Sequence, residues 1–241
     1  MNRIAVITPV PDLVTKIIQE SIVRKSIENG LAQIDVVNLR NFTEGNYRQV
    51  DDAPFGGGDG MVMMAKPFFK AIDHTISEWK RCEKIEIVYP SPQGKQWSQN
   101  IAKDFAQEKN IIFLCGHYKG IDERVIEKYV TYEFSLGDYV ISGGELSAMV
   151  MLDSIIRMIP GVINSFDSAM SDSFMNGLLD APYYTRPREV EGRCVPDILL
   201  NGNHKEIDNW RQKKREERTE KKRIDLWKKF NTMKRNGVSN E

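Results

Sequence analysis

Three glycine-bearing segments of the chain contain residue types that could hold a small-molecule ligand. Glycine has no Cβ, so the backbone around it can approach a ligand closely. For any one such segment, turn formation is the simpler explanation, because glycine and proline are ordinary turn residues. The segments are YPSPQG (Tyr89–Gly94), CGHYKG (Cys115–Gly120) and LGDYVISGGEL (Leu136–Leu146).

The common fingerprints of catalysis and cofactor binding are absent from the sequence. The GGGDG run (Gly56–Gly60) lacks the Lys-Ser/Thr of a phosphate loop, and its glycines miss the GxGxxG spacing of a dinucleotide site. No GxSxG elbow points to a nucleophilic serine. The cysteines and histidines are too scattered for a zinc cluster or a disulfide framework. They are Cys82, Cys115, Cys194, His74, His117 and His204.

Apolar periodicity predicts strands that alternate with helices. The alternation predicts an α/β fold with a mostly parallel sheet covered on both faces. Ligands of such sheets bind outside the carboxyl ends of the strands, where the three segments would converge, so the sequence favours a pocket there. The expected strands are Arg3–Thr8, Ile34–Leu39, Lys84–Tyr89, Ile111–Cys115, Thr131–Ser135 and Tyr139–Ile141. The expected helices are Leu13–Gly30, Phe68–Lys80, Ser98–Gln107, Asp122–Tyr129 and one that begins near Gly144.

The composition is that of a soluble globular protein, with 41% hydrophobic and 28% charged residues. No apolar run is long enough to span a membrane, and the start of the chain reads as a first strand rather than a signal peptide. We therefore expect a cytoplasmic protein. Although the net charge is zero, His204–Arg235 holds 13 Lys and Arg against 6 Asp and Glu. This basic stretch indicates either an anionic polymer as partner or a solvated helix with internal ion pairs, and charge alone does not separate the two.

Eight sequence blocks between Arg48 and Arg211 together resemble one family. In chain order they are VDDAPFGGGDGMVMM, SPQG, CGHYKGIDERV, SLGDYVISGGEL, DSIIRMIPGV, SDSF, GLLDAPYYTRP and GNHKEIDNWR. The series is similar to the bacterial tRNA (guanine-N1)-methyltransferases, the TrmD family of the SPOUT class. The resemblance implies a parallel α/β sheet with a deep C-terminal trefoil knot, followed by a small all-helical domain. The implied domains are 1–160 for the knotted methyltransferase domain, 161–172 for a linker and 173–241 for a helical tRNA-binding domain.

The resemblance also implies the ligands. S-adenosylmethionine would be the methyl donor and tRNA the acceptor, at N1 of guanosine 37 beside the anticodon. The protein would be a homodimer that binds neither membrane nor DNA, and magnesium dependence is implied without an identifiable ligand set. We expect a side chain at Gly143 or Gly144 to meet ligand or backbone. The implied cofactor wall is Tyr89, Ser91, Pro92, Gly116, Leu136, Gly137, Asp138, Tyr139, Val140, Ile141, Gly143 and Gly144.

The same resemblance assigns the catalytic roles. Asp172 aligns with the family's general base and Arg157 with its catalytic arginine. Read locally, Asp172 is an N-cap in SDSF, and Arg157 lies four residues after Asp153, the spacing of a helical ion pair. In a dimer, Asp172 would reach the cofactor of the opposite chain. The helix from Glu145 to Pro160 is apolar on nearly every side, so it would serve the core and the dimer interface together.

Some positions depart from the family pattern. Lys119 stands where glutamate is common near the methionine end of the cofactor, and Glu123 or Asp122 are the alternatives for that contact. Ser147 replaces a common proline, and His117 a common arginine. Two other interpretations stay open. One is a SPOUT enzyme that methylates a ribose 2′-hydroxyl, and the other is an RNA-binding protein without catalysis.

Overall fold

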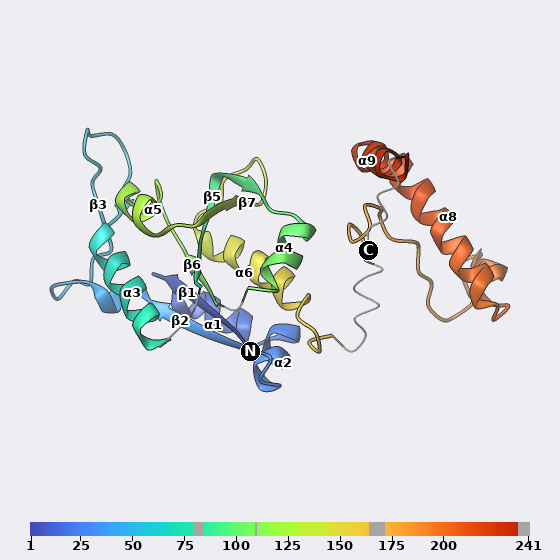
Figure 1. Cartoon of the computed structure of the whole chain (residues 1–241), viewed down its shortest axis with the longest axis horizontal. Helices are drawn as coiled ribbons and strands as arrows, with labels where there is room; N and C mark the ends of the chain where they lie inside the picture. Colours follow the sequence, from blue (N-terminus) through green and yellow to red (C-terminus); the bar gives the residue numbers. More distant parts are fainter. Residues whose placement is uncertain (80–83, 109, 164–171, 236–241) are drawn as a thin grey trace. The chain divides into compact units, whose positions relative to one another are not determined.

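The computed structural model describes residues 1–79, 84–108, 110–163 and 172–235 (Figure 1). The chain divides into two compact units, Met1–Asn164 and Ser165–Glu241. Each unit is described by itself below. Cys82 lies outside the described residues.

The first unit is built on a five-stranded sheet in the order β2 (Ala32–Asn38), β1 (Asn2–Thr8), β6 (Asn110–Leu114), β5 (Glu86–Gln96), β7 (Tyr132–Ser135). Every neighbouring pair runs parallel, which confirms the predicted parallel sheet. The central strands have side chains buried on both faces, as parallel sheets require.

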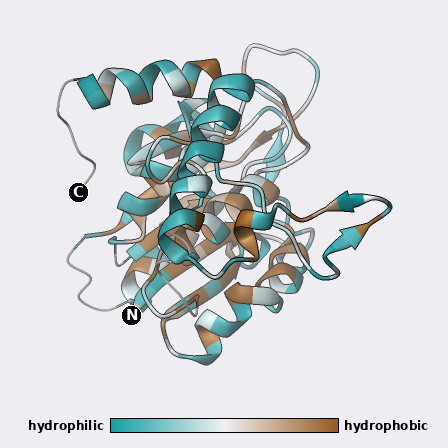
Figure 2. Ribbon diagram, turned by 90° about the vertical axis from the view of Figure 1, so that its right-hand side faces the viewer, coloured by the Kyte–Doolittle hydropathy of each residue, from teal (hydrophilic) through white to brown (hydrophobic). Residues whose placement is uncertain are grey.

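Six helices cover the two faces of this sheet in the described residues. Alternation along β1 shows the division: Ile4 and Val6 pack into one apolar cluster, and Ala5 and Ile7 into the other. The first cluster includes buried residues of α1 (Pro11–Ile18), α2 (Ser21–Glu28), α4 (Gln99–Phe105) and α6 (Gly144–Ile156). The second includes residues of α3 (Ala65–Glu78) and α5 (Glu123–Tyr129). The sheet is therefore the middle of three layers, and Figure 2 shows its strands largely brown, the colour of apolar residues.

Three predicted elements differ from the structure. The single helix expected over Leu13–Gly30 is two helices, because Gln19 and Glu20 leave helical geometry and Ser21 has a positive φ of 53°. The strand expected to end at Tyr89 continues to Gln96 through an irregularity in its pairing with β7, so YPSPQG belongs to β5 instead of a loop. No strand forms at Tyr139–Ile141, which lies in the connection from β7 to α6.

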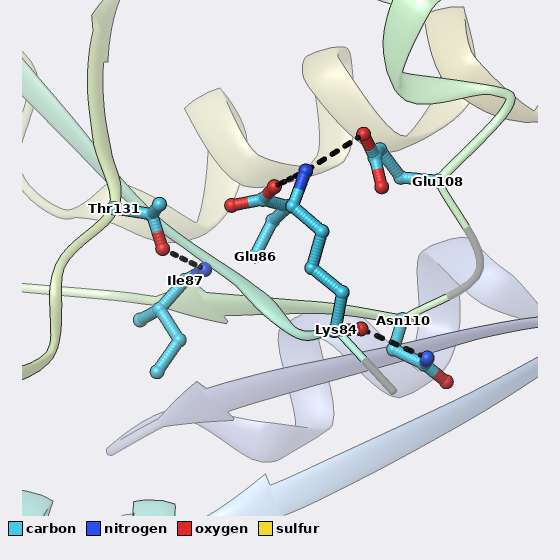
Figure 3. A network of polar contacts seen from close by, with 6 residues as sticks. All are labelled: Lys84, Glu86, Ile87, Glu108, Asn110 and Thr131. Atoms are coloured by element: carbon cyan, nitrogen blue, oxygen red, sulfur yellow. Dashed lines mark hydrogen bonds and ion pairs between the residues drawn. The ribbon is translucent and has the colours of Figure 1, made fainter. Parts of the chain in front are cut away.

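The amino-terminal end of β5 is fixed by a polar network (Figure 3). Glu86 is buried, and Nζ of Lys84 lies 2.5 Å from its carboxylate and 3.3 Å from that of Glu108. A buried carboxylate is stable only when a partner compensates its charge. Asn110 Nδ2 donates to the Lys84 carbonyl at 3.0 Å, which joins the start of β5 to β6. The network therefore fixes the position of β5 at its amino-terminal end, where the chain enters the sheet.

A short segment precedes α3 on the way from β2. It consists of the 3-10 turn η1 (Leu39–Phe42) and a two-stranded ladder of β3 (Asp51–Asp52) with β4 (Val62–Met63). The glycine-rich GGGDG run connects β3 to β4, and Phe55 beside it is fully exposed. Gly56, Gly57, Gly58 and Gly60 all have positive φ, a conformation that glycine adopts without strain.

The second unit contains two long helices and a short hairpin. The helices are α8 (His204–Lys222) and α9 (Ile224–Arg235), and they coincide with the basic stretch. The hairpin pairs β8 (Glu189–Val190) with β9 (Arg193–Cys194) and is followed by the turn η2 (Asp197–Leu199). The prediction of an all-helical second domain is therefore wrong in this detail. Glu191 and Gly192 both have positive φ, the turn geometry that two-residue hairpins favour.

Side chains of α8 hold the preceding segment by hydrogen bonds. Arg215 is buried, and its Nη2 donates to Asn176 Oδ1 at 2.7 Å. Arg218 Nη1 donates to the Asp180 carbonyl at 3.0 Å, and Thr219 Oγ1 accepts from the Leu179 amide at 2.8 Å. These three residues are structural, so they differ from the exposed lysines of the same helix. No helix in the described part of the chain is long and apolar enough to cross a membrane.

Candidate functional site

A cavity of about 200 Å³ lies beside the middle of β5 and at the carboxyl ends of β6 and β7. Its wall comes from the three glycine-bearing segments singled out in the sequence, which the parallel sheet brings to one edge. Of the twelve predicted cofactor residues, all line the cavity except Asp138. The other lining residues are Pro90, Gln93, His117, Tyr118, Lys119, Gly120, Ile121, Glu123, Ile126, Phe134, Ser135, Ser142 and Ser147.

A buried carboxylate lies directly behind this wall. Glu145, in the first turn of α6, is 2% exposed, and both its oxygens lie 2.9 Å from His117 Nε2. Thr8, the last residue of β1, donates its hydroxyl to the same carboxylate at 2.6 Å. A backbone hydrogen bond joins the same two segments, since the Gly144 amide donates to the Gly116 carbonyl at 2.8 Å. This network ties the β6–α5 connection to the start of α6 and to the sheet.

The sequence reasoning missed Glu145 and gave His117 no role. The partners are 28 and 137 residues from Glu145 along the chain, so no local spacing brings them together. The available signal is a carboxylate in the first turn of a mostly apolar helix, which predicts a buried partner without saying which residue it is.

Two glycines of the SGGEL run are required by the protein's own packing. A Cβ at Gly143 would lie 2.5 Å from His117 Nε2 and 2.6 Å from Glu145 Oε2. A Cβ at Gly144 would lie 3.0 Å from the Cα of Cys115. At Gly143 the obstacle is thus the His117–Glu145 pair of side chains, not the expected ligand or backbone, whereas at Gly144 it is backbone as expected.

Tyr89 forms the floor between two other glycines. Cβ atoms at Gly116 and Gly120 would lie 3.2 Å and 2.9 Å from its phenol oxygen. Burial raises the pKa of Tyr89, and a hydrogen bond from the Ile121 backbone acts in the opposite direction. Burial also raises the pKa of the Cys115 thiol well above its ordinary value. Both side chains are therefore neutral at physiological pH.

The acids near Lys119 have different surroundings. Asp122 accepts from the Arg124 amide as the N-cap of α5, and its carboxylate lies 2.6 Å from the Arg124 guanidinium. Glu123 lines the cavity, whereas Asp122 does not. Lys119 lines it as well, with its side chain against the place where Gly60 would carry a Cβ. Of the two alternatives to the family glutamate, Glu123 is the one at the cavity.

The two predicted catalytic residues lie in different units. Arg157 is the C-cap of α6, and its charge counteracts the burial that raises the pKa of Asp153, so these two side chains are electrostatic neighbours as the spacing predicts. Helix α6 rises about 1.5 Å per residue, which puts Arg157 roughly 15 Å along the helix from Ser147 at the cavity. Asp172 is half-buried in the second unit, and the described residues after it form turns instead of the expected helix. No group of three or more His, Cys, Asp or Glu side chains suited to a metal ion occurs among the described residues.

Comparisons with known proteins give one consistent result. Residues 2–229 match the family described as tRNA (Guanine-1)-methyltransferase TrmD. A tRNA (guanine-N(1)-)-methyltransferase of Clostridioides difficile is 44% identical over 229 residues, which is 95% of this chain and 99% of the relative. Enzymes with the same description from Listeria monocytogenes and Anoxybacillus flavithermus are 43% and 45% identical, over 95% and 93% of this chain and 93% and 91% of the relatives. The match spans both compact units.

Proposed function

The chain belongs to the TrmD family of tRNA (guanine-1)-methyltransferases, and on that premise we propose that it transfers the methyl group of S-adenosylmethionine to N1 of guanosine 37 in tRNA. The observation that carries the proposal is the cavity. Segments that lie far apart in the sequence converge on it, and they are the segments that the family resemblance assigns to the cofactor.

The cavity fits such a cofactor in its chemistry. Apolar and aromatic side chains suited to an adenosine alternate with glycines and serines that expose backbone polar groups, as ligand pockets generally require. Tyr89, Ser91, Pro92 and the Leu136–Ile141 stretch would hold the adenosine. When bound, the donor supplies an electrophilic methyl group on a sulfonium. The connection from β7 to α6 would be the knot loop around it.

The proposed acceptor chemistry uses Asp172 and Arg157. At neutral pH guanine N1 carries a proton, so its lone pair is not free to attack. Asp172 would take that proton in the manner of a general base, as the N1–C bond forms and the bond between the methyl group and the donor sulfur breaks. As the proton leaves, negative charge would spread onto guanine O6, where the Arg157 guanidinium would stabilise it.

A homodimer would complete this site. Arg157 lies roughly 15 Å along α6 from the edge of the cavity in the same chain, so its side chain does not reach that cavity directly. Leu146 and Val150 lie one helical turn apart on α6 and are each 51% exposed. Large apolar side chains exposed together on a helix indicate an interface, and here the proposed partner is a second copy of the chain. The catalytic pair of one copy would then serve the cavity of the other.

The tRNA would bind through its phosphates to the exposed lysines of α8 and α9. Lys213, Lys221 and Lys222 are exposed, whereas Arg215 is buried and Arg218 donates to the Asp180 carbonyl. Phosphate contacts of this kind position a nucleic acid without reading its sequence.

Methyl transfer to defined transcripts tests the proposal. The protein is incubated with tritiated S-adenosylmethionine and unmodified tRNA carrying guanosine or adenosine at position 37. We expect incorporation only with guanosine, and 1-methylguanosine after digestion to nucleosides. A ribose-methylated nucleoside would identify a 2′-hydroxyl methyltransferase, and tRNA binding without incorporation would identify a non-catalytic RNA-binding protein.

A further inference from the structure

A second cavity, of about 230 Å³, lies beside α4 and the edge strand β7. It shares only Phe134 with the described wall of the cavity proposed for the cofactor, so the two are separate sites. None of its residues has a part in the proposed methyl transfer. The lining consists of Lys95, Ile101, Asp104, Phe105, Glu108, Tyr132 and Phe134.

Three aromatic rings form one side of this second cavity. Alternate residues of a strand point to the same face of a sheet, so Tyr132 and Phe134 share a face. Their rings stack with centroids 5.6 Å apart and an angle of 11° between their planes. Phe105 of α4 meets both rings edge-on, at 5.4 Å and 5.5 Å. Phe105 and Phe134 are buried, whereas Tyr132 is 41% exposed, so Tyr132 is the ring that a ligand can reach.

Carboxylates outnumber cations on the other side. Asp104 and Glu108 are four residues apart, at the end of α4 and just beyond it, where a helix itself favours positive charge. Glu108 shares its cation, because Nζ of Lys84 lies 3.3 Å from Glu108 and 2.5 Å from Glu86 (Figure 3). Asp104 is exposed and forms no ion pair within the described part of the chain. Lys95 is the one cation of the described lining, so the two acids are not fully neutralised.

We propose that this second cavity binds a small organic cation with an alkylated ammonium group, held between the carboxylate of Asp104 and the ring of Tyr132. An aromatic face and a nearby carboxylate together attract such a cation. A primary ammonium group needs acceptors for three N–H donors, whereas an alkylated one buries its methyl groups against the rings without losing hydrogen bonds. The positive charge of Lys95 disfavours a ligand with two cationic groups. The proposal does not depend on methyl transfer, since no residue of the second cavity takes part in it.

Binding of choline and of its uncharged carbon analogue tests the proposal. In the analogue a tert-butyl group replaces the trimethylammonium group, so the shape is kept and the charge is lost. The full-length isotope-labelled protein is titrated with each compound, and its backbone amide signals are followed by NMR. We expect choline to bind with a dissociation constant on the order of 1 mM, with shifts on α4 and β7, and the analogue to bind at least roughly fivefold more weakly.

Three variants test the two groups that hold the cation and the one that opposes it. Asp104→Asn should weaken choline roughly threefold and leave the carbon analogue unchanged, because only the charge is removed. Lys95→Met should strengthen choline by a similar factor, since it removes a repelling charge. Tyr132→Leu keeps an apolar side chain but lacks the ring, so choline should bind roughly threefold more weakly. Tyr132→Phe retains the ring and should bind choline as the unchanged protein does.

Matched controls separate charge at the second cavity from charge in general. Lys103→Met removes an exposed lysine of α4 that is outside the lining, and Glu78→Gln removes an exposed acid of α3. Neither should alter choline binding. Unfolding temperatures equal to that of the unchanged protein should show that every variant is folded.

A trimethylammonium group also occurs in the headgroup of a choline lipid, so phosphatidylcholine vesicles form a second arm of the experiment. The phosphate of that headgroup would lie beside the carboxylates, so we expect free choline to bind and the vesicles not to co-sediment the protein. Co-sedimentation without binding of free choline would contradict a site for a free solute. The proposal is also overturned if choline does not bind, if its carbon analogue binds equally well, if Asp104→Asn and Tyr132→Leu have no effect, or if the shifts fall on the connection from β6 to α5.

Discussion

His117 and Glu145 are joined through the wall of the cavity, with the imidazole Nε2 2.9 Å from both carboxylate oxygens. The carboxylate is almost fully buried, so its stability depends on this contact and on the hydroxyl of Thr8. Gly143 leaves the space in which the pair fits. The protein's own side chains therefore pack this part of the wall.

A Gly143→Val change should damage the fold and the ligand site together. Because its Cβ would displace His117 and Glu145, we expect the free energy of unfolding to fall by about 1–3 kcal/mol and S-adenosylmethionine affinity to fall with it. Thermal unfolding and calorimetry measure the two effects. Ser142→Ala, the preceding position, is the control and should keep the unfolding temperature. Reduced affinity at full stability would show that Gly143 faces the ligand instead.

Replacing Asp172 with Asn should separate chemistry from binding. The amide preserves the shape of the side chain but cannot accept a proton, so we expect single-turnover methylation to slow by about 10²–10⁴. The dissociation constant for S-adenosylmethionine and the unfolding temperature should not change. Asp197→Asn removes an exposed carboxylate of the same unit and should retain full turnover. An Asp172→Asn protein within a few-fold of the normal rate would place the base elsewhere.

A Val150→Glu change tests the proposed dimer face. Val150 is 51% exposed in the single chain, so a charge there should leave the fold intact while an interface would bury it at high cost. Analytical ultracentrifugation should show monomers, and these should no longer methylate tRNA. Ile76→Glu, at a similarly apolar and partly exposed position of α3, should leave the dimer unaffected. If the Val150→Glu protein stays dimeric, the interface uses another face.

Neutralising Lys213, Lys221 and Lys222 together with Gln tests the RNA contacts. The structural residues Arg215 and Arg218 remain, so the second unit should stay folded. We expect weaker tRNA binding and a salt dependence whose logarithmic slope falls by roughly one for every phosphate that the variant no longer binds. S-adenosylmethionine affinity should be unchanged.

The control for this triple variant combines Lys16, Lys25 and Lys103 of the first unit, also changed to Gln. It removes the same number of positive charges from α1, α2 and α4, so tRNA binding should stay as in the unchanged protein. Equally weak binding by both triple variants would indicate a general charge effect and contradict a tRNA site on α8.

The second unit also explains why a deletion is a poor test of RNA binding. Removing the chain after Gly202 would take away Arg215, Arg218 and Thr219, which hold the segment at 176–180. That segment closely follows Asp172. Weaker tRNA binding would then report a damaged fold as much as a missing phosphate site.

The sequence by itself determined the layered α/β fold and the edge of the sheet where the cavity lies. Apolar periodicity is a local property, and parallel strands put their carboxyl ends on one edge, so three marked segments could be assigned to one site without coordinates. The family was also readable, because its motifs are contiguous blocks. Local patterns failed where the backbone left regular geometry, as at Ser21, in the irregular part of β5, and in the turn at Glu191 and Gly192.

Only the tertiary structure decided which side chains meet. Thr8, His117 and Glu145 belong to three segments far apart in the chain, and their contact depends on how α6 packs on the sheet. The same packing explains why residue 143 is a glycine, because a Cβ there would collide with His117 and Glu145. It also brings Lys119 and Glu123 to the wall of the described cavity. Spacing along a chain cannot encode such contacts, because they follow from the positions of whole helices and strands.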